Sequence, residues 1–126
     1  MQTVVDMRHR ERVVIDTARL DELFKRLGPR GAEDYVMDHV EDISERLADI
    51  EFQHRQGALS EIAREAQTVS QLCTEIGLTS LARVVSDLGV SAGRGDMIAF
   101  RAVWERLVRI GDRSLAQVWE VPGLSL

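Results

Sequence analysis

Apolar residues recur along most of the chain at alternating steps of three and four, the spacing that gathers them on one side of an α-helix. Five such series are present: Leu20, Phe24 and Leu27; Val36, Val40, Ile43, Leu47 and Ile50; Leu59, Ile62, Ala66, Val69, Cys73 and Ile76; Leu78, Leu81, Val85 and Leu88; and Met97, Phe100, Trp104, Leu107, Gly111, Leu115 and Val118. No window longer than a few residues alternates with the period of two that is typical of a half-buried strand. The pattern predicts an all-α chain with five helices.

Turn and capping residues separate the five series. Asp16 is suited to cap the first helix, and the segment Gly28-Pro29-Arg30-Gly31 is expected to end it. Gly57 and Gly77 mark the next two breaks, and Asp96 follows a glycine-rich turn where it can cap the last helix. Short links between helices of similar length favour antiparallel neighbours. The expected fold is an up-and-down antiparallel four-helix bundle with a short N-terminal capping helix.

Length and composition support a single domain. The 126 residues, 44% of them hydrophobic, are enough for one contiguous core. We expect an N-terminal arm over residues 1–12, the helical domain over residues 13–121 and a C-terminal tail over residues 122–126.

Charge and residue usage exclude several classes of partner. The net charge of -5 argues against a general affinity for nucleic acid or anionic lipid. No apolar run approaches the roughly 20 residues that a membrane-spanning helix needs, and no secretory signal is apparent. The single cysteine, Cys73, cannot form an internal disulfide. We therefore expect a cytoplasmic protein with no cofactor, no membrane partner and no nucleic-acid partner.

One face of the predicted third helix is polar and carries candidate binding residues. At 100° per residue the core side centres near Ala66 and Cys73, so the opposite side faces water. The residues expected on that side are Ser60, Arg64, Gln67, Gln71 and Thr74. Gln67 lies near the middle of this face, and Arg64 precedes it by one turn.

A series of small motifs surrounds Gln67. Ala66 is followed by Gln67-Thr68-Val69-Ser70-Gln71-Leu72, then by Gly77, the pair Leu81-Ala82, Leu88 and the turn Arg94-Gly95-Asp96. In this order and spacing the chain resembles the histidine-containing phosphotransfer (Hpt) domain family, whose corresponding helix reads approximately Ala-His-x-Leu-Lys-Gly-Ser. The likeness extends over about Val13 to Leu115. It implies an Hpt-like bundle that acts in two-component phosphorelay signalling and whose partner is a response-regulator receiver domain or a histidine kinase.

The chain departs from the family pattern at the positions that carry its chemistry. Gln67 stands where the family has its phosphoacceptor histidine, and an amide whose nitrogen lone pair is delocalised cannot act as that nucleophile. Ser70 stands in place of a lysine that offsets phosphoryl charge, and Gln71 in place of a glycine. The resemblance thus implies a protein with no catalytic residue. Its expected partner-binding face consists of Ser60, Arg64, Gln67, Ser70, Gln71 and Thr74.

The three histidines offer weaker alternatives. His39 stands among Asp38, Asp42 and other acidic residues and is expected to be solvated. Glu51 and His54 have the Glu-x-x-His spacing of di-iron bundles, but the second such pair is missing, so no metal site is predicted. Phosphotransfer through His39 or His54 in place of Gln67 remains an alternative, although neither has the surrounding lysine and glycine.

Other distinctive residues are expected to pack. Cys73 and Trp104 fall on core positions. Trp119 either covers the end of the bundle or joins a partner surface, and Phe52 is either an exposed apolar spot or packs against the third helix. Arg64 is either a solvated side chain or a contact for the acidic pocket of a receiver domain.

Two classes of function compete at this point. In the first, the chain is a non-catalytic Hpt-like protein that binds a receiver or kinase without carrying phosphate. In the second, it is an interaction or dimerisation protein that shares only the fold, because a fold does not determine a function. The expected oligomeric state is a monomer or a weak homodimer.

Overall fold

The computed structural model describes residues 13–121, which are helical apart from short links. Its elements are α2 (Thr17–Gln56), α3 (Leu59–Glu75), α4 (Thr79–Arg94), α5 (Met97–Gln117) and the short 3₁₀ turn η1 (Val118–Glu120). The all-α prediction is confirmed for these residues, none of which lies in a strand. The predicted arm of residues 1–12 and tail of residues 122–126 lie outside the described residues.

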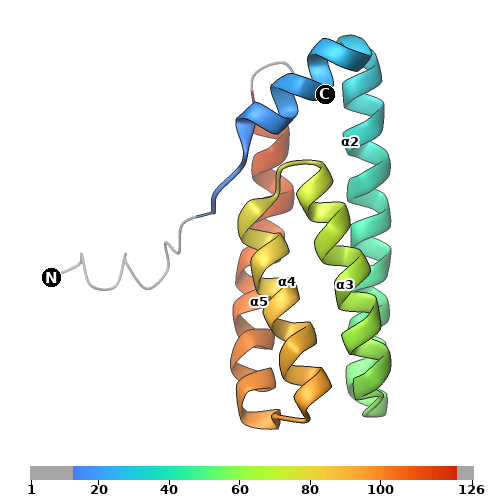
Figure 1. The fold of residues 1–126 in the computed structure, drawn as a ribbon, viewed down its shortest axis with the longest axis vertical. Coiled ribbons are helices and arrows are strands. Elements are labelled where there is room, and N and C mark those ends of the chain that lie inside the picture. The colour runs from blue at the N-terminus through green and yellow to red at the C-terminus, as the bar shows by residue number, and fades with distance from the viewer. Residues whose placement is uncertain (1–12, 122–126) are drawn as a thin grey trace, which may run out of the picture.

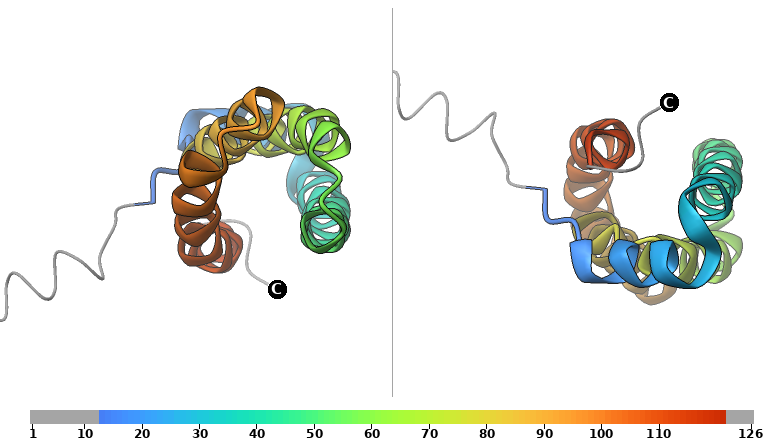
Figure 2. Two further views of the ribbon diagram at one scale, coloured as in Figure 1. Left: turned by 90° about the horizontal axis from the view of Figure 1, so that it is seen from below. Right: turned by 90° about the horizontal axis from the view of Figure 1, so that it is seen from above.

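The four helices pack side by side, and consecutive helices run in opposite directions (Figure 1). Helix α3 packs against α2 and α4, and α4 packs against α5. Viewed along the bundle, the helices follow an arc with α2 and α5 at its two ends (Figure 2). The predicted four-helix bundle is therefore present, with its least tightly packed side between α2 and α5.

Helix α2 includes a kink that the sequence pattern predicted as a break between two helices. Gly28 has φ 77° and ψ 169°, outside the helical region, and the part of α2 before it lies across one end of the bundle (Figure 1). Pro29 follows directly, and proline is tolerated in the first turn of a helix because its missing N–H has no partner there. The helix restarts without a loop, so no separate capping helix exists within residues 13–121.

The segment just before α2 is fastened to the turn between α3 and α4 and to the first turn of α4. The backbone N–H of Asp16 donates to the carbonyl of Gly77 at 2.8 Å, and the N–H of Val14 donates to the Ser80 hydroxyl at 2.7 Å. The Asp16 carboxylate in turn accepts from the N–H of Arg19 at 3.2 Å, so it caps α2 as predicted. Asp96 caps α5 in the same way through the N–H of Ala99.

The core contains most of the predicted apolar positions together with Leu23 and Ile110, which the predicted series did not include, whereas the predicted positions Leu27 and Met97 are exposed. Its largest fully buried side chains are Phe100, Leu20, Leu23, Ile43, Ile50, Ile62, Ile76, Leu78, Leu81, Leu88 and Ile110. Trp104 and Trp119 are half-buried and pack against this core, whereas Phe52 is 57% exposed, so the first of its two predicted placements is the correct one. No helix within residues 13–121 combines the length and apolar character needed to cross a bilayer.

Candidate functional site

Helix α3 turns Gln67 outward because its other side supplies core residues. Ile62, Ala66, Val69 and Cys73 are buried at steps of three and four, and Gln67 is exposed on the opposite side. Ser60, Arg64, Gln71 and Thr74 are exposed as well. The structure thus brings five of the six predicted partner-binding residues onto one open face of α3.

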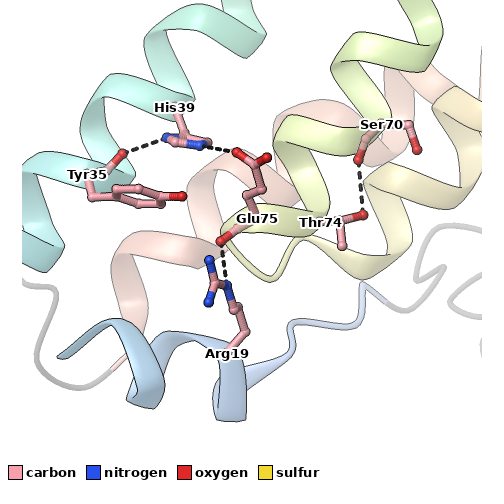
Figure 3. Close-up of polar contacts among 6 residues, drawn as sticks. All are labelled: Arg19, Tyr35, His39, Ser70, Thr74 and Glu75. Carbon is pink, nitrogen blue, oxygen red and sulfur yellow. Dashed lines mark hydrogen bonds and ion pairs between the residues drawn. The ribbon is translucent and has the colours of Figure 1, made fainter. Parts of the chain in front are cut away.

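Ser70 differs from the other five. It is half-buried, and its hydroxyl donates to the carbonyl of Ala82 on α4 at 2.9 Å. The carbonyl of Ser70 accepts from the Thr74 hydroxyl at 3.1 Å (Figure 3). The Ser70 hydroxyl therefore joins α3 to α4 and is not free to contact a partner.

A shallow hollow of about 230 Å³ lies beside Gln67, between α3 and α4. Its lining residues are Ala63, Ala66, Gln67, Ser86, Gly89 and Val90. The helices come close here, because a Cβ on Gly89 would lie 2.9 Å from the Cβ of Ala66. Apart from Gln67 and Val90, the lining side chains are small, so the backbones of both helices are accessible to an approaching surface.

Helix α4 contributes an outer stripe to the same face. Arg83, Val90 and Arg94 are spaced by seven and four residues, which places them on one side of the helix, and all three are exposed. Asp87, one turn after Arg83 on the same side of α4, is exposed as well. We define the Gln67 face as the exposed residues Ser60, Arg64, Gln67, Gln71, Thr74, Arg83, Ser86, Asp87, Val90 and Arg94. The sequence pattern did not predict the α4 half of this face, although the spacing of its small residues was a usable signal.

The Gln67 face is positively charged on a negatively charged protein. It includes Arg64, Arg83 and Arg94 and one carboxylate, Asp87, so its formal charge is positive. The whole chain has a net charge of -5. Because surface charges act over roughly 8–10 Å at physiological ionic strength, these three arginines create a local field opposite in sign to the net charge.

A second, polar hollow borders this face on the α2 side. It has a volume of about 580 Å³ and is lined by Gln53, Ser60, Glu61, Arg64, Glu65 and Thr68. Glu65 is paired with Arg46 of α2 at 3.0 Å, and Arg46 also binds Asp42 at 2.8 Å. The two carboxylates from α3, Glu61 and Glu65, thus delimit the positive face toward α2.

The prediction that His39 is a solvated side chain is wrong. Its side chain is 15% exposed, and its Nε2 lies 2.8 Å from a carboxylate oxygen of Glu75 on α3. Its Nδ1 lies 3.0 Å from the carbonyl of Tyr35, whose ring stacks on the imidazole (Figure 3). The charged neighbours in the sequence suggested solvent exposure, but the packing of α2 on α3 encloses the ring. With both nitrogens engaged, His39 is not presented as a phosphoacceptor.

The same cluster fastens the first part of α2 to the bundle. Arg19 lies before the kink, and its Nε donates to the backbone carbonyl of Glu75 at 2.9 Å (Figure 3). Glu75 therefore holds both parts of α2 to the end of α3, through His39 and through Arg19. This network is structural and lies at one end of the bundle.

His54 also has a packing role. Its ring is half-buried between Phe100 and Trp104 of α5, with ring centroids 5.0 and 5.1 Å away. Within residues 13–121, no three histidine, cysteine, aspartate or glutamate side chains come together as a possible metal site.

Cys73 is a core residue, as predicted, and is fully buried in α3. Burial raises the pKa of its thiol from 9.0 to about 12, because a thiolate would lose its hydration. We expect the thiol to react with an aromatic disulfide reagent at pH 8 only through unfolding, and therefore at least about a hundredfold faster in denaturing urea. The rate of absorbance change measures this directly.

The raised thiol pKa also has a defined sign for stability. The pKa of the Cys73 thiol is higher in the folded than in the unfolded state, so the neutral thiol contributes its full stabilisation below pH 9. This contribution is lost as the pH rises toward 12. Comparison with Cys73→Ala isolates the effect, since the variant should lose less stability than the natural chain over this alkaline interval. Rapid thiol labelling of the native protein at pH 8 would contradict the burial argument.

Comparisons with protein-family models, with curated proteins and with solved structures found no match for this chain. The family resemblance therefore depends on the order and spacing of the motifs around Gln67. The function is therefore inferred from the geometry and charge of the Gln67 face.

Proposed function

We propose that the chain is a non-catalytic Hpt-like protein that binds a response-regulator receiver domain or a histidine kinase through the Gln67 face, without carrying phosphate. The observation that carries the proposal is the position of Gln67. It is exposed on α3, beside a hollow of small residues, where the resembled family has its phosphoacceptor histidine. An accessible amide at this point permits docking and excludes nucleophilic attack on phosphorus.

The charge of the Gln67 face supports an acidic partner surface. Arg64, Arg83 and Arg94 are exposed, and they outnumber the single carboxylate of the face, Asp87. Arginine presents a planar fork that suits two-point contacts with carboxylates. The resemblance implies a receiver domain, whose pocket is acidic, so the two surfaces are complementary in sign.

The small side chains of the face support close docking. Ala63, Ser86 and Gly89 leave the α3 and α4 backbones accessible around Gln67, and Val90 adds an apolar contact that is 49% exposed. A polar rim with a small apolar centre is typical of transient interfaces between signalling proteins. Gln71 projects from α3 beside this centre and adds an amide contact.

A phosphotransfer assay tests the absence of catalysis. Receiver domains labelled with radioactive phosphate, incubated with this protein, are expected to leave it unlabelled, because neither Gln67 nor the engaged His39 offers a free imidazole. An established Hpt protein with its own labelled receiver serves as the positive control. Acid-labile label on this chain would overturn the non-catalytic assignment.

A binding titration with charge-reversed variants tests the docking surface. Arg64→Glu is expected to weaken calorimetrically measured binding of a receiver domain by about tenfold or more, because it places a carboxylate opposite an acidic surface. Arg30→Glu makes the same change of charge at an exposed position of α2 outside the Gln67 face and should leave the affinity unchanged. Equal weakening by both variants would mean that net charge, and not the Gln67 face, determines the affinity. The absence of binding by every receiver domain and histidine kinase tested would refute the proposal.

A further inference from the structure

Helix α5 carries a row of partly or fully exposed residues that is apolar except for Arg101. Met97, Arg101, Trp104, Val108 and Leu115 are spaced by four, three, four and seven residues, which places them on one side of the helix. Steps of three and four are the pattern with which two helices pack along each other. Val108 is 56% exposed and Met97 is 42% exposed, so residues 13–121 leave these two side chains of the row largely uncovered.

Two hollows lie along this row. The first, of about 240 Å³, is lined from α2 by Leu47, Ala48 and Glu51 and from α5 by Trp104, Leu107, Val108, Gly111, Asp112 and Leu115. The second, of about 340 Å³, is lined by Met97, Ile98, Arg101, Ala102 and Glu105 of α5 alone. The first hollow therefore lies between α2 and α5, the two helices at the ends of the arc (Figure 2).

Gly111 deepens the first hollow. A Cβ at this position would meet no atom within 4 Å, so the helix leaves space there that its own chain does not fill. Ala48 keeps the opposite wall on α2 short. The row thus has projections at Val108 and Met97 and a recess at Gly111.

The row is complementary to itself when two copies run antiparallel. With a two-fold axis between the levels of residues 104 and 108, Trp104 lies opposite Val108 of the second copy and Met97 lies opposite its Leu115. Arg101 then lies opposite Gly111 and Asp112 of the second copy, so its stem meets the recess and its guanidinium meets a carboxylate. Arg101 and Asp112 are both exposed. Two-fold symmetry forms each of these contacts twice.

From this complementarity we infer that a second copy of the chain covers the α5 row, forming a symmetric antiparallel homodimer. An unrelated amphipathic helix as the occupant would not explain why α5 carries opposite charges, Arg101 and Asp112, at two levels that face each other in an antiparallel pair of α5 helices. A single helix pair gives a small interface, so the dimer is weak, with a dissociation constant in the micromolar range. The Gln67 face on α3 and α4 remains open in it.

A charge-swap experiment tests the inference on the full chain. Sedimentation velocity over a wide concentration range is expected to show a monomer–dimer equilibrium. Arg101→Asp alone and Asp112→Arg alone should each raise the dissociation constant by about tenfold or more, because each replaces two attractive pairs with two repulsive ones. The double variant R101D/D112R restores opposite charges and is expected to return the dissociation constant to within about threefold of the natural value.

The controls separate loss of this interface from unfolding and from a change in net charge. Both positions are exposed, so circular dichroism and thermal melting of each variant should match the natural chain. Arg30→Asp makes the same change of charge outside α5 and should leave the equilibrium unchanged. A protein that stays monomeric at millimolar concentration, or a dimer that the single swaps leave intact, would overturn the inference. Neither outcome bears on receiver binding, which is measured separately through Arg64.

Discussion

Gly77→Ala is expected to lower the free energy of unfolding by about 3 kcal/mol, through backbone strain together with a steric clash. Gly77 has φ 78°, a conformation that residues with a Cβ rarely adopt. A Cβ there would also lie 2.7 Å from the backbone oxygen of Asp16. Asp16 cannot retreat freely, because its N–H donates to the Gly77 carbonyl at 2.8 Å and its carboxylate caps α2. Urea unfolding followed by circular dichroism measures the loss.

Gly57→Ala is the matched control for Gly77. Its φ is 72°, so the backbone strain is similar, but a Cβ there would have no atom within 4 Å. The expected loss is about 1 kcal/mol, the strain alone. The difference between the two variants reports the contact between the segment just before α2 and the α3–α4 turn. Equal losses would mean that this contact contributes nothing to stability.

Phe100→Ala is expected to lower the free energy of unfolding by about 3–5 kcal/mol. Phe100 is fully buried on α5, and its ring lies 5.0 Å from that of His54 on α2 and 6.3 Å from that of Trp104. Truncation removes apolar contacts and leaves a cavity at the point where rings link α2 to α5. Because the neighbouring side chains relax only partly into such a cavity, most of the lost packing is not recovered.

Phe52→Ala makes the same truncation at a side chain that is 57% exposed. It is expected to change the free energy of unfolding by no more than about 0.5 kcal/mol. Both variants can be compared in one urea series with the midpoint and slope fitted separately. A loss at Phe52 equal to that at Phe100 would contradict the difference in burial between the two rings.

The helices were predictable because their determinants are local. Steps of three and four among apolar residues gave the buried sides of α3 and α4, but on α5 only part of the series is buried, because Met97 is exposed and Trp104 and Leu115 are half-buried. Asp16 and Asp96 cap helices because a side-chain oxygen reaches the N–H three residues on. Gly57, Gly77 and Gly95 mark the ends because they adopt positive φ at low cost.

Only the α3 half of the Gln67 face was predictable, because only that half follows from a local pattern. The outward side of α3 follows from its own period, so the exposure of Gln67, Arg64 and Gln71 was correctly predicted. The contribution of α4 depends on which of its sides approaches α3, which the period of α4 alone does not give. Ser70 reads as polar in the sequence, but its hydroxyl is used by the carbonyl of Ala82, a contact between helices.

By itself, the sequence determined where this protein is helical, which sides of α3 and α4 are buried and that an amide occupies the exposed position on α3, because hydrophobic period, caps and turns act within a few residues. Only the tertiary structure decided that His39 is enclosed by Glu75 and Tyr35, that α3 and α4 together form a positive face, and that α5 leaves an apolar row uncovered. The His39–Glu75 contact and the α3–α4 face join residues far apart in the chain, and the exposure of the α5 row depends on where the other helices lie. Their proximity is set by how the helices pack, and a periodic pattern carries no information about which helix lies beside which.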